Sequence, residues 1–505
     1  MSRIAERLGT LAPAGLKDMR CGIEKESLRV RPDGGLAVTP HPRALGSTLT
    51  HPHITTDFSE SQLELITAAH PGAAACLGEL THIHQVVYGA IGDQLLWGSS
   101  MPCGLPADDA IPIGQYGSSN IGRAKSVYRV GLSHRYGRRM QAISGIHYNW
   151  SLPGLGNADY FALIRNFRRQ GWLLFYLFGA SPAVCSSFVE GRKHELQALS
   201  ATNLYLPHAT TLRMGRLGYQ SEAQASIAAS FNDLESYGAA LEEALTRAWP
   251  DYEKIGIRGA NGEYNQLSTA LLQIENEFYG KVRPKRRIRP GERPLHALRE
   301  RGVEYVEVRL MDLDPFSPIG ITAPVCRFLD LFLLHCLLGE SPPDTPGEIA
   351  SIARNQEKVA ARGREPGLRL ARGSQQVALD EWGGQVLAEC APIAAAVDAA
   401  LGGNAYREAL AAAAAALADP AATPSARVLA AMAEGYDNSY TRFALDQSRK
   451  HRTVLQALPL AAGVAQRFAA MAEESLALQR RMEAQDKLPF EAWRQHYLSA
   501  ERLKV

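Results

Sequence analysis

The chain has 505 residues, of which 46% are hydrophobic and 21% are charged, and its formal net charge at pH 7 is +2. These values are typical of a globular protein with a large core, and the small net charge gives no overall field that would attract nucleic acid or an anionic membrane. The longest apolar runs, residues 172–180 and 332–338, are well short of the ~20 residues that a membrane span needs. With no apolar signal segment at its start, the sequence predicts a cytoplasmic protein.

The seven cysteines are odd in number and lack CxxC spacing: Cys21, Cys76, Cys103, Cys185, Cys326, Cys336 and Cys390. This pattern indicates reduced thiols rather than a disulfide framework, although it leaves the pairing of individual cysteines open.

Strand and helix patterns follow one another irregularly over the first two thirds of the chain. Two-residue alternation predicts strands at residues 21–30, 53–67, 140–152, 271–279 and 303–310. Apolar residues spaced three and four apart predict helices at residues 73–96, 159–178, 221–246 and 324–338. Because the two kinds of element do not alternate regularly, we expect an α+β fold with a largely antiparallel sheet.

A Pro- and Gly-rich segment, residues 339–347, marks a loop or a boundary, and the composition changes after it. Residues 391–422 are dominated by alanine, a strong helix former, with prolines that interrupt the pattern. We therefore expect a catalytic core of sheet and helices over residues 1–340. Residues 341–505 then form a helical region that packs on the core and carries little chemistry.

The first predicted strand carries two acids two positions apart, Glu24 and Glu26, which therefore point to the same face. Burying two like charges is costly unless a cation lies between them. This segment alone fits either a solvated strand face or half of a site for hard metal ions.

Two more segments add acids that could share such a site. Glu64 lies on the face opposite two leucines, and Asp57 precedes an aromatic residue, where we expect the strand to kink. Glu307 and Arg309 share one face of a strand whose other face is apolar. They could form a simple ion pair, but the strand pattern indicates an internal position, so we expect the pair to face a cavity.

Polar residues also share a face in the two remaining strand patterns. One set is Gln141, His147 and Asn149, and the other is Gln273, Glu275, Glu277 and Tyr279. A lone histidine is commonly structural, but a neutral imidazole can bind metal where carboxylates converge. Four strands with one apolar and one acid-rich face predict a sheet curved around a polar funnel.

Carboxylates with a single imidazole suit Mg²⁺ or Mn²⁺, whereas zinc favours thiolates or several histidines. Several acids holding two or three such ions are typical of a site that receives a nucleotide triphosphate. The basic run at residues 281–289 could contact phosphates or form a solvated loop; it lacks the interleaved aromatics of a nucleic-acid patch. Residues 117–123 nearly match a phosphate-binding loop, but Arg123 and Ala124 replace its lysine and hydroxyl residue, so we reject that motif.

Together these segments resemble the bacterial glutamate–cysteine ligases (γ-glutamylcysteine synthetases) of type 1 over about residues 20–340. The matching segments are GIEKESLRV (22–30), THPHITTDFSESQLELIT (50–67), SMPC (100–103), QYGSSNIGR (115–123), ISGIHYNWSLP (143–153), LFGASPAVCSSF (177–188), QIENEFYGKVRPKR (273–286) and EYVEVRLMDLDPFSPIGI (304–321). The segment 154–158 is short for the family, which puts that loop alone in doubt.

The resemblance implies a glutamine-synthetase-like fold whose curved, mainly antiparallel sheet forms a funnel-shaped active site. It implies a reaction in which ATP phosphorylates the γ-carboxylate of L-glutamate and the α-amine of L-cysteine displaces the phosphate, the first step of glutathione biosynthesis. It also implies Mg²⁺, with Mn²⁺ as an alternative, small-molecule partners alone and a monomer, and it leaves open feedback inhibition by glutathione.

The resemblance assigns roles residue by residue. It implies these metal ligands: Glu24, Glu26, Asp57, Glu64, His147 and Glu307. Arg309 would stabilise the transferring phosphoryl group, with Glu24 and Glu307 beside it in catalysis, and Gln141 and Asn149 would line the glutamate side. The implied cysteine pocket contains Phe58, Tyr128, Leu132, Arg213, Tyr219 and Tyr279. The implied ATP contacts are Lys125, Arg283 and Lys285.

Three other functions remain to be weighed. A ligase of the same fold that joins glutamate to another amine would share the phosphorylation machinery and differ only in the acceptor pocket. A nucleic-acid-binding protein would use the basic run at residues 281–289 and would not need the acids. A structural protein without catalysis would leave the polar strand faces unexplained.

Overall fold

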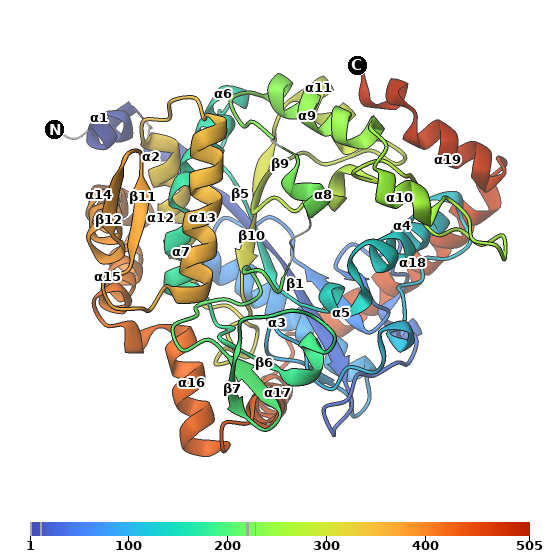
Figure 1. The fold of residues 1–505 in the computed structure, drawn as a ribbon, viewed down its shortest axis with the longest axis horizontal. Coiled ribbons are helices and arrows are strands. Elements are labelled where there is room, and N and C mark those ends of the chain that lie inside the picture. The colour runs from blue at the N-terminus through green and yellow to red at the C-terminus, as the bar shows by residue number, and fades with distance from the viewer. Residues whose placement is uncertain (1–2, 11–12, 219–221, 228) are drawn as a thin grey trace.

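A computed structural model of the chain describes residues 3–10, 13–218, 222–227 and 229–505. An antiparallel sheet crosses the middle of the molecule, and helices pack on both sides of it (Figure 1). The prediction of an α+β fold is confirmed.

Within the described residues the central sheet has seven strands, and all of its strand pairs are antiparallel. Six follow the order β2-β3-β1-β5-β10-β9, and the short β4 pairs with the end of β1. Their bounds are β1 Arg20–Val30, β2 Ile54–Thr56, β3 Gln62–Ile66, β4 Leu95–Leu96, β5 Ile146–Ser151, β9 Val282–Lys285 and β10 Tyr305–Met311. Because β1 pairs with both β3 and β5, it brings the side chains of three strands together.

Alternate residues of the three strands β1, β5 and β10 make one face of the sheet apolar: Ile23, Tyr148, Trp150, Val306 and Val308. These buried side chains belong to one hydrophobic cluster with the helices α3 (Ala73–Ala90) and α12 (Ala323–Leu338). Since successive side chains on a strand point to opposite faces, Glu24 and Glu26 of β1 lie on the other face. The apolar face therefore positions the acids.

Within the described residues up to 338, the helices are α1 Arg3–Thr10, α2 Pro13–Lys17, α3, α4 Asn120–Tyr136, α5 Arg138–Gln141, α6 Asn157–Gln170, α7 Trp172–Phe178, α8 Glu222–Ala225, α9 Leu234–Thr246, α10 Pro250–Ile255, α11 Pro294–Arg301 and α12. The four helices predicted in this part are present, some of them shortened or divided, but six others were not predicted: α1, α2, α4, α5, α10 and α11. The predicted helix 159–178 is divided at Gly171 into α6 and α7. The predicted helix 221–246 is divided into α8 and α9, because the Asp233 side chain accepts a hydrogen bond from the Ser236 backbone and begins a new helix.

One strand prediction is wrong in part, and another is wrong throughout. The segment 140–145 is not strand: Gln141 ends α5, so it does not share a strand face with His147 and Asn149. The segment 271–279 contains no strand either, and Glu275–Glu277 form a 3₁₀ turn. Alternation of polar and apolar residues matches any segment that is alternately buried.

Both acids of that 3₁₀ turn, Glu275 and Glu277, are paired with other groups of the protein. The Arg293 guanidinium donates to the Glu275 carboxylate at 2.8 Å, and both side chains are buried. Arg135 donates to Glu277 at 2.9 Å, and the backbone N–H of Gln273 donates to the other Glu277 oxygen at 2.7 Å. Bonds of a carboxylate to nearby backbone N–H groups compete with strand pairing, which is why the alternation here does not give a strand.

The part of the chain after residue 345 is mostly helical. Its elements are α13 Pro346–Arg362, β11 Arg369–Arg372, β12 Gln375–Ala378, α14 Leu379–Leu401, α15 Ala405–Ala418, α16 Pro424–Gly435, α17 Tyr440–Ala457, α18 Val464–Gln485 and α19 Phe490–Leu498. By length and composition α14 alone, among the described helices, is long and apolar enough to cross a membrane, and its buried side lies against α12 and α15.

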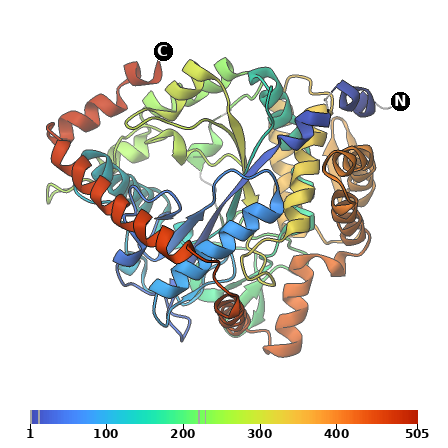
Figure 2. The ribbon, with the colours of Figure 1, turned by 180° about the vertical axis from the view of Figure 1, so that it is seen from behind.

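The last helices return to the sheet-bearing part of the molecule. Figure 2 shows α18 crossing the back of the molecule beside α3. Glu483 of α18 accepts a hydrogen bond from the Ser118 backbone N–H at 2.8 Å, just before α4 begins. Phe490, at the start of α19, also contacts α4: the Arg123 guanidinium lies 4.5 Å from the centre of its ring. The end of the chain thus holds the start of α4 in place.

Cys103 and Cys185 form a disulfide whose Cα atoms lie 5.8 Å apart, although 82 positions separate them in the sequence. The disulfide joins the loop after β4 to β6 (Ala183–Cys185), which belongs to a small sheet with β7 (Gln197–Ser200) and β8 (Asn203–Tyr205). The prediction of reduced thiols is wrong for this pair, because spacing along the chain does not report distance in the fold. The five other cysteines are free and buried.

Candidate active site

The polar face of the sheet carries the acids of β1 next to the polar residues of β5. In the strand register Glu24 lies opposite His147, and Glu26 lies opposite Glu64 of β3. The Asn149 side chain amide donates to Glu24 at 2.9 Å. Three strands therefore bring these side chains to one place, as the alternation predicts.

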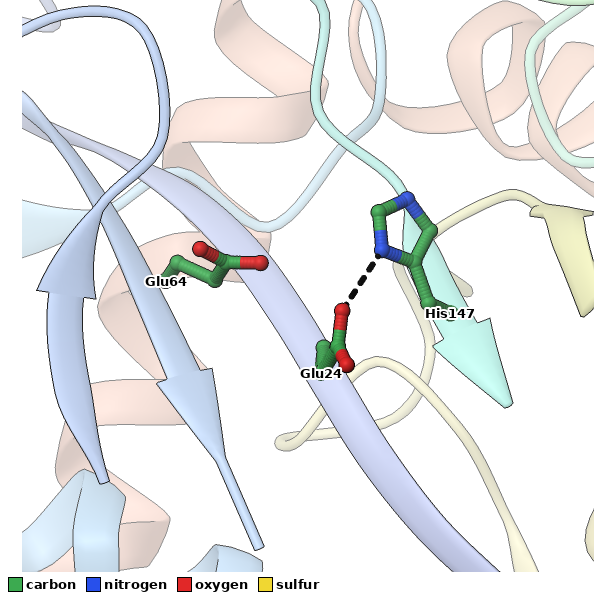
Figure 3. Close-up of side chains that lie close together, drawn as sticks. All are labelled: Glu24, Glu64 and His147. Carbon is green, nitrogen blue, oxygen red and sulfur yellow. Dashed lines mark hydrogen bonds and ion pairs between the residues drawn. The ribbon is translucent and has the colours of Figure 1, made fainter. Parts of the chain in front are cut away.

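Figure 3 shows Glu24, Glu64 and His147 directed toward one another. The His147 Nδ1 atom lies 3.0 Å from a Glu24 carboxylate oxygen, and one potential ligand atom from each of the three residues lies within 4.8 Å of the others. Burial and the nearby Arg309 lower the pKa of His147, so its imidazole is neutral near pH 7. A neutral imidazole has a lone pair available for a metal ion.

Two further acids of the cluster, Glu26 and Glu64, have too little positive charge near them. Burial and the charge of Asp57 raise the pKa of Glu26 to about 8, even though the Gly145 backbone N–H donates to its carboxylate at 2.7 Å. Burial and the charge of Glu24 raise the pKa of Glu64 well above its ordinary value. Raised values mean that the protein supplies too little positive charge to stabilise these carboxylates.

Glu307 on β10 has cations on both sides. Arg309 donates to one of its oxygens at 3.0 Å, and the Lys285 ammonium lies 3.2 Å from the other. Although burial acts to raise it, these cations hold the pKa of Glu307 well below its ordinary value. Arg309 also lies 3.4 Å from His147 Nδ1 and lines a cavity, whereas Glu307 does not line it, so the expectation that the pair faces a cavity is met for Arg309 alone.

The residues present fit a divalent metal ion that prefers oxygen ligands. Within the described part of the chain, the carboxylates of Asp57 and Glu64 have no hydrogen-bond or ion-pair partner. The buried Oδ1 atom of Asn149 has none either. Unpartnered carboxylate and amide oxygens beside one neutral imidazole are the ligand set of Mg²⁺ or Mn²⁺.

A cavity of about 100 Å³ opens beside the acid cluster. Ten of the sequence-predicted site residues line it: Glu26, Asp57, Phe58, Tyr128, Leu132, Gln141, His147, Arg213, Tyr279 and Arg309. They come from the sheet, from α4 and α5, and from loops that are far apart in the sequence. The cavity therefore joins predicted metal ligands to the predicted acceptor pocket.

Gln141 lies in the wall of this cavity beside Tyr279 rather than on a strand beside Asn149. Its side chain amide donates to the Tyr279 hydroxyl at 2.8 Å. The strand prediction for residues 140–145 is therefore wrong about the element that carries Gln141, but Gln141 still lies in the predicted site.

The three predicted ATP contacts lie around the cavity rather than in its wall. The Lys125 ammonium lies 5.2 Å from the centre of the Tyr116 ring, and burial lowers its pKa to about 8. Arg283 is buried and donates to the Asn276 carbonyl at 3.0 Å, while Lys285 pairs with Glu307. The predicted residue Tyr219 lies outside the described residues.

Sequence analysis missed five residues that line the cavity: Arg129, Met214, Asn276, Gly280 and Lys281. Arg129 follows Tyr128 and lies one helical turn after Lys125, so the pattern of α4 could have identified it. Lys281 is the first residue of the basic run, but no local pattern separates it from the rest of that run.

A family model for glutamate-cysteine ligase matches residues 10–359 of the chain. The chain is 50% identical to the glutamate–cysteine ligase of Pseudomonas entomophila, with 93% of this chain and 92% of that protein covered, and 46% identical to that of Alcanivorax borkumensis, with 98% of each covered. A crystal structure of glutamate–cysteine ligase from Francisella tularensis in complex with AMP is 34% identical, with a TM-score of 0.91 and coverage of 95% and 97%. The family model ends at residue 359, whereas the match to the Alcanivorax borkumensis protein covers 98% of the chain and so includes the C-terminal helices.

Proposed function

The chain belongs to the glutamate–cysteine ligase family, and we propose that it joins the γ-carboxyl group of L-glutamate to the α-amine of L-cysteine with the hydrolysis of ATP to ADP and phosphate. The observation that carries this proposal is the cluster of buried acids with too few cations, which adjoins a cavity lined by the predicted acceptor residues.

The order of the reaction follows from the chemistry of its groups. A carboxylate is a poor electrophile, so ATP first phosphorylates the γ-carboxylate of glutamate, and the acyl phosphate then reacts with the amine and releases phosphate. Arg309 lies beside Glu307 and His147, where its fixed charge can stabilise the transferring phosphoryl group. Holding both substrates in one cavity supplies much of the remaining rate enhancement.

Magnesium is the proposed metal, and manganese is an alternative. Glu24, Glu26, Asp57, Glu64, His147 and Glu307 would hold it. When bound, the metal neutralises the charge of the ATP phosphates and of the acids. The chain's own contribution is to hold these side chains in place from β1, β3, β5 and β10.

The substrate contacts complete the proposal. Gln141 and Asn149 serve glutamate, and these residues surround cysteine: Phe58, Tyr128, Leu132, Arg213, Tyr219 and Tyr279. Lys125, Arg283 and Lys285 contact ATP. The neighbouring structure with AMP supports an adenine nucleotide as ligand, because it shares the fold at 34% identity.

Several wider properties belong to the same proposal. We infer a cytoplasmic monomer with small-molecule partners, since ATP and amino acids are substrates inside the cell, and with the catalytic residues in residues 1–340. Glutathione is a candidate feedback inhibitor, because it contains the γ-glutamylcysteine unit that this site would make. The basic run does not favour nucleic acid, since Lys285, Arg287 and Arg289 each pair with an acid.

The decisive experiment measures ADP release from ATP, Mg²⁺ and L-glutamate as candidate amines are added one at a time. We expect L-cysteine to stimulate release more than any other amine. If another amine does so instead, the same-fold alternative holds. If cysteine gives no stimulation over glutamate alone, the proposed function is wrong. Metal binding has an independent readout: Mg²⁺ should raise the melting temperature of the wild type and not that of Glu24→Gln.

A further inference from the structure

Lys281 is a cation in the cavity wall that the proposed mechanism does not use. It directly precedes β9, and its carbonyl accepts the backbone N–H of Arg309 at 2.9 Å, which fixes its backbone beside the reacting groups. Its side chain lines the cavity next to Tyr279 and Met214. None of the described residues pairs with its ammonium group by a hydrogen bond or an ion pair.

The other cations of the cavity wall are already engaged by the protein. Arg213 lies 3.8 Å from the buried Asp312 carboxylate and donates to the Arg309 carbonyl at 3.1 Å. Arg309 pairs with Glu307. Arg129 donates to the Lys125 carbonyl at 3.0 Å. Lys281 thus differs from these neighbours, because no described residue accepts a hydrogen bond from its ammonium group or forms an ion pair with it.

The surroundings of Lys281 leave its charge only weakly compensated. Burial and the repulsion of Arg168 lower the pKa of its ammonium to about 8, and Glu357 acts in the opposite direction. Glu357 is itself paired with Arg216. An ammonium group that has lost part of its hydration binds a carboxylate strongly, because the ion pair replaces the hydrogen bonds to water that were lost.

We propose that Lys281 is a specificity-determining residue that binds the α-carboxylate of the acceptor amino acid. This inference rests on the proposed function. Glu26 and Asp57, which also line this cavity, offer no positive charge to the acceptor, whereas Lys281 offers one. The carboxylate therefore orients toward Lys281, beside Arg213. The site then prefers amino acids to amines that lack a carboxylate.

The test compares Lys281→Met, which keeps the apolar stem, with Lys281→Arg, which keeps the charge. Steady-state assays measure the KM values for L-cysteine, L-glutamate and ATP, and the ratio of kcat/KM for L-cysteine to that for cysteamine, which lacks the carboxylate. We expect Lys281→Met to raise the cysteine KM by about tenfold or more and to lower that ratio by a similar factor. The other two KM values should change less than about twofold, and Lys281→Arg should recover much of the loss. Lys254→Met, at an exposed lysine of α10, is the matched control and should behave as wild type.

The outcomes separate this assignment from the proposed function. A wild type without cysteine-dependent ADP release refutes the proposed function, and this assignment with it. With an active wild type, an unchanged cysteine KM in Lys281→Met refutes only the role of Lys281. A rise confined to the glutamate or ATP KM, or equal rises in all three, likewise overturns it, because a lysine that only shapes the cavity would not act on one substrate.

Discussion

The molecule contains two sets of buried acids that look alike in sequence and differ in structure. Glu24 and Glu26 lie two apart on β1, and Glu275 and Glu277 lie two apart in a 3₁₀ turn. The second set is paired with Arg293 and Arg135 and hydrogen-bonded to backbone N–H groups. In the first set Glu26 has a raised pKa, and its neighbour across the sheet, Glu64, has no partner among the described residues.

The difference shows what distinguishes a ligand from a structural acid. Burying a carboxylate requires positive charge, and the protein either supplies that charge itself or leaves it to a ligand. Where an arginine of the chain forms an ion pair with the acid, the pair is part of the folded structure. Where the described chain provides too few cations, the acids are the ones that we propose to hold a metal ion. Partners, rather than residue type or spacing, therefore separate the two sets.

The largest effect is expected for Glu24→Gln. Removing this charge from the acid cluster should lower turnover by at least about 10²–10³-fold, because the loss falls on electrostatic stabilisation of the transition state. Without metal the variant should still fold, since the glutamine side chain keeps an oxygen that can accept the hydrogen bond from Asn149. Kinetics, circular dichroism and thermal melting check this prediction. Normal activity in Glu24→Gln would exclude Glu24 from the metal site.

Glu277→Gln should have the opposite pattern. It leaves the fully buried Arg135 without its ion-pair partner, so we expect a loss of about 3–5 kcal/mol in the free energy of unfolding. Mg²⁺ should still raise the melting temperature of the variant. Urea denaturation measures the loss, and Glu263→Gln, at an exposed acid of the preceding loop, is the matched control. An effect no larger than that control would contradict the structural role.

Asp330 of α12 sharpens the comparison, because it is a buried acid with neither a cation beside it nor a place in the site. The Tyr148 and Tyr406 hydroxyls donate to it at 2.8 and 3.0 Å, and burial raises its pKa to about 7. The folded state then binds this proton more tightly than the unfolded state, so the contribution of Asp330 to stability is fully present below about pH 4 and is lost as pH rises through about 7. Between pH 5 and 8 the wild type should lose about 2–3 kcal/mol more than Asp330→Asn. Urea denaturation at both pH values checks this, and parallel losses in the two proteins would contradict it.

The smallest effect concerns the acceptor side of the cavity. Tyr279→Phe removes the hydroxyl that accepts from Gln141, and we expect the cysteine KM to rise about three- to tenfold, as for the loss of one hydrogen bond. The glutamate KM should change less. Steady-state kinetics with each substrate varied in turn measures both. Equal effects on the two KM values would separate Tyr279 from the acceptor pocket.

Much of the site follows from local alternation. Glu24, His147 and Glu307 lie in well-formed strands with an apolar opposite face, so their common direction is fixed by the residues around them. The kink at Asp57 is also local, because β2 ends at Thr56 and β3 begins at Gln62. These predictions succeed because burying the apolar face determines the direction of the polar one.

Other features depend on contacts between distant segments and could not be predicted. The sequence around residue 275 resembles a strand, and only the arrival of Arg293 and Arg135 explains its turn. The pairing of Cys103 with Cys185 and the placement of Lys281 in the cavity wall are likewise set by the fold as a whole. Local pattern gives the direction of a side chain, but not the identity of its partner.

The contacts of α18 and α19 with α4 have a consequence for how the protein is made. Tyr128 and Leu132 of α4 line the cavity, and Ser118 and Arg123 near its start are held by residues of α18 and α19, far later in the chain. The strands β1, β3 and β5, which carry most of the clustered acids, emerge from the ribosome first, and the wall opposite them is braced only after α18 and α19 have followed. A chain still attached to the ribosome can therefore assemble the acids of the site before it can shape the cavity that accepts an amine.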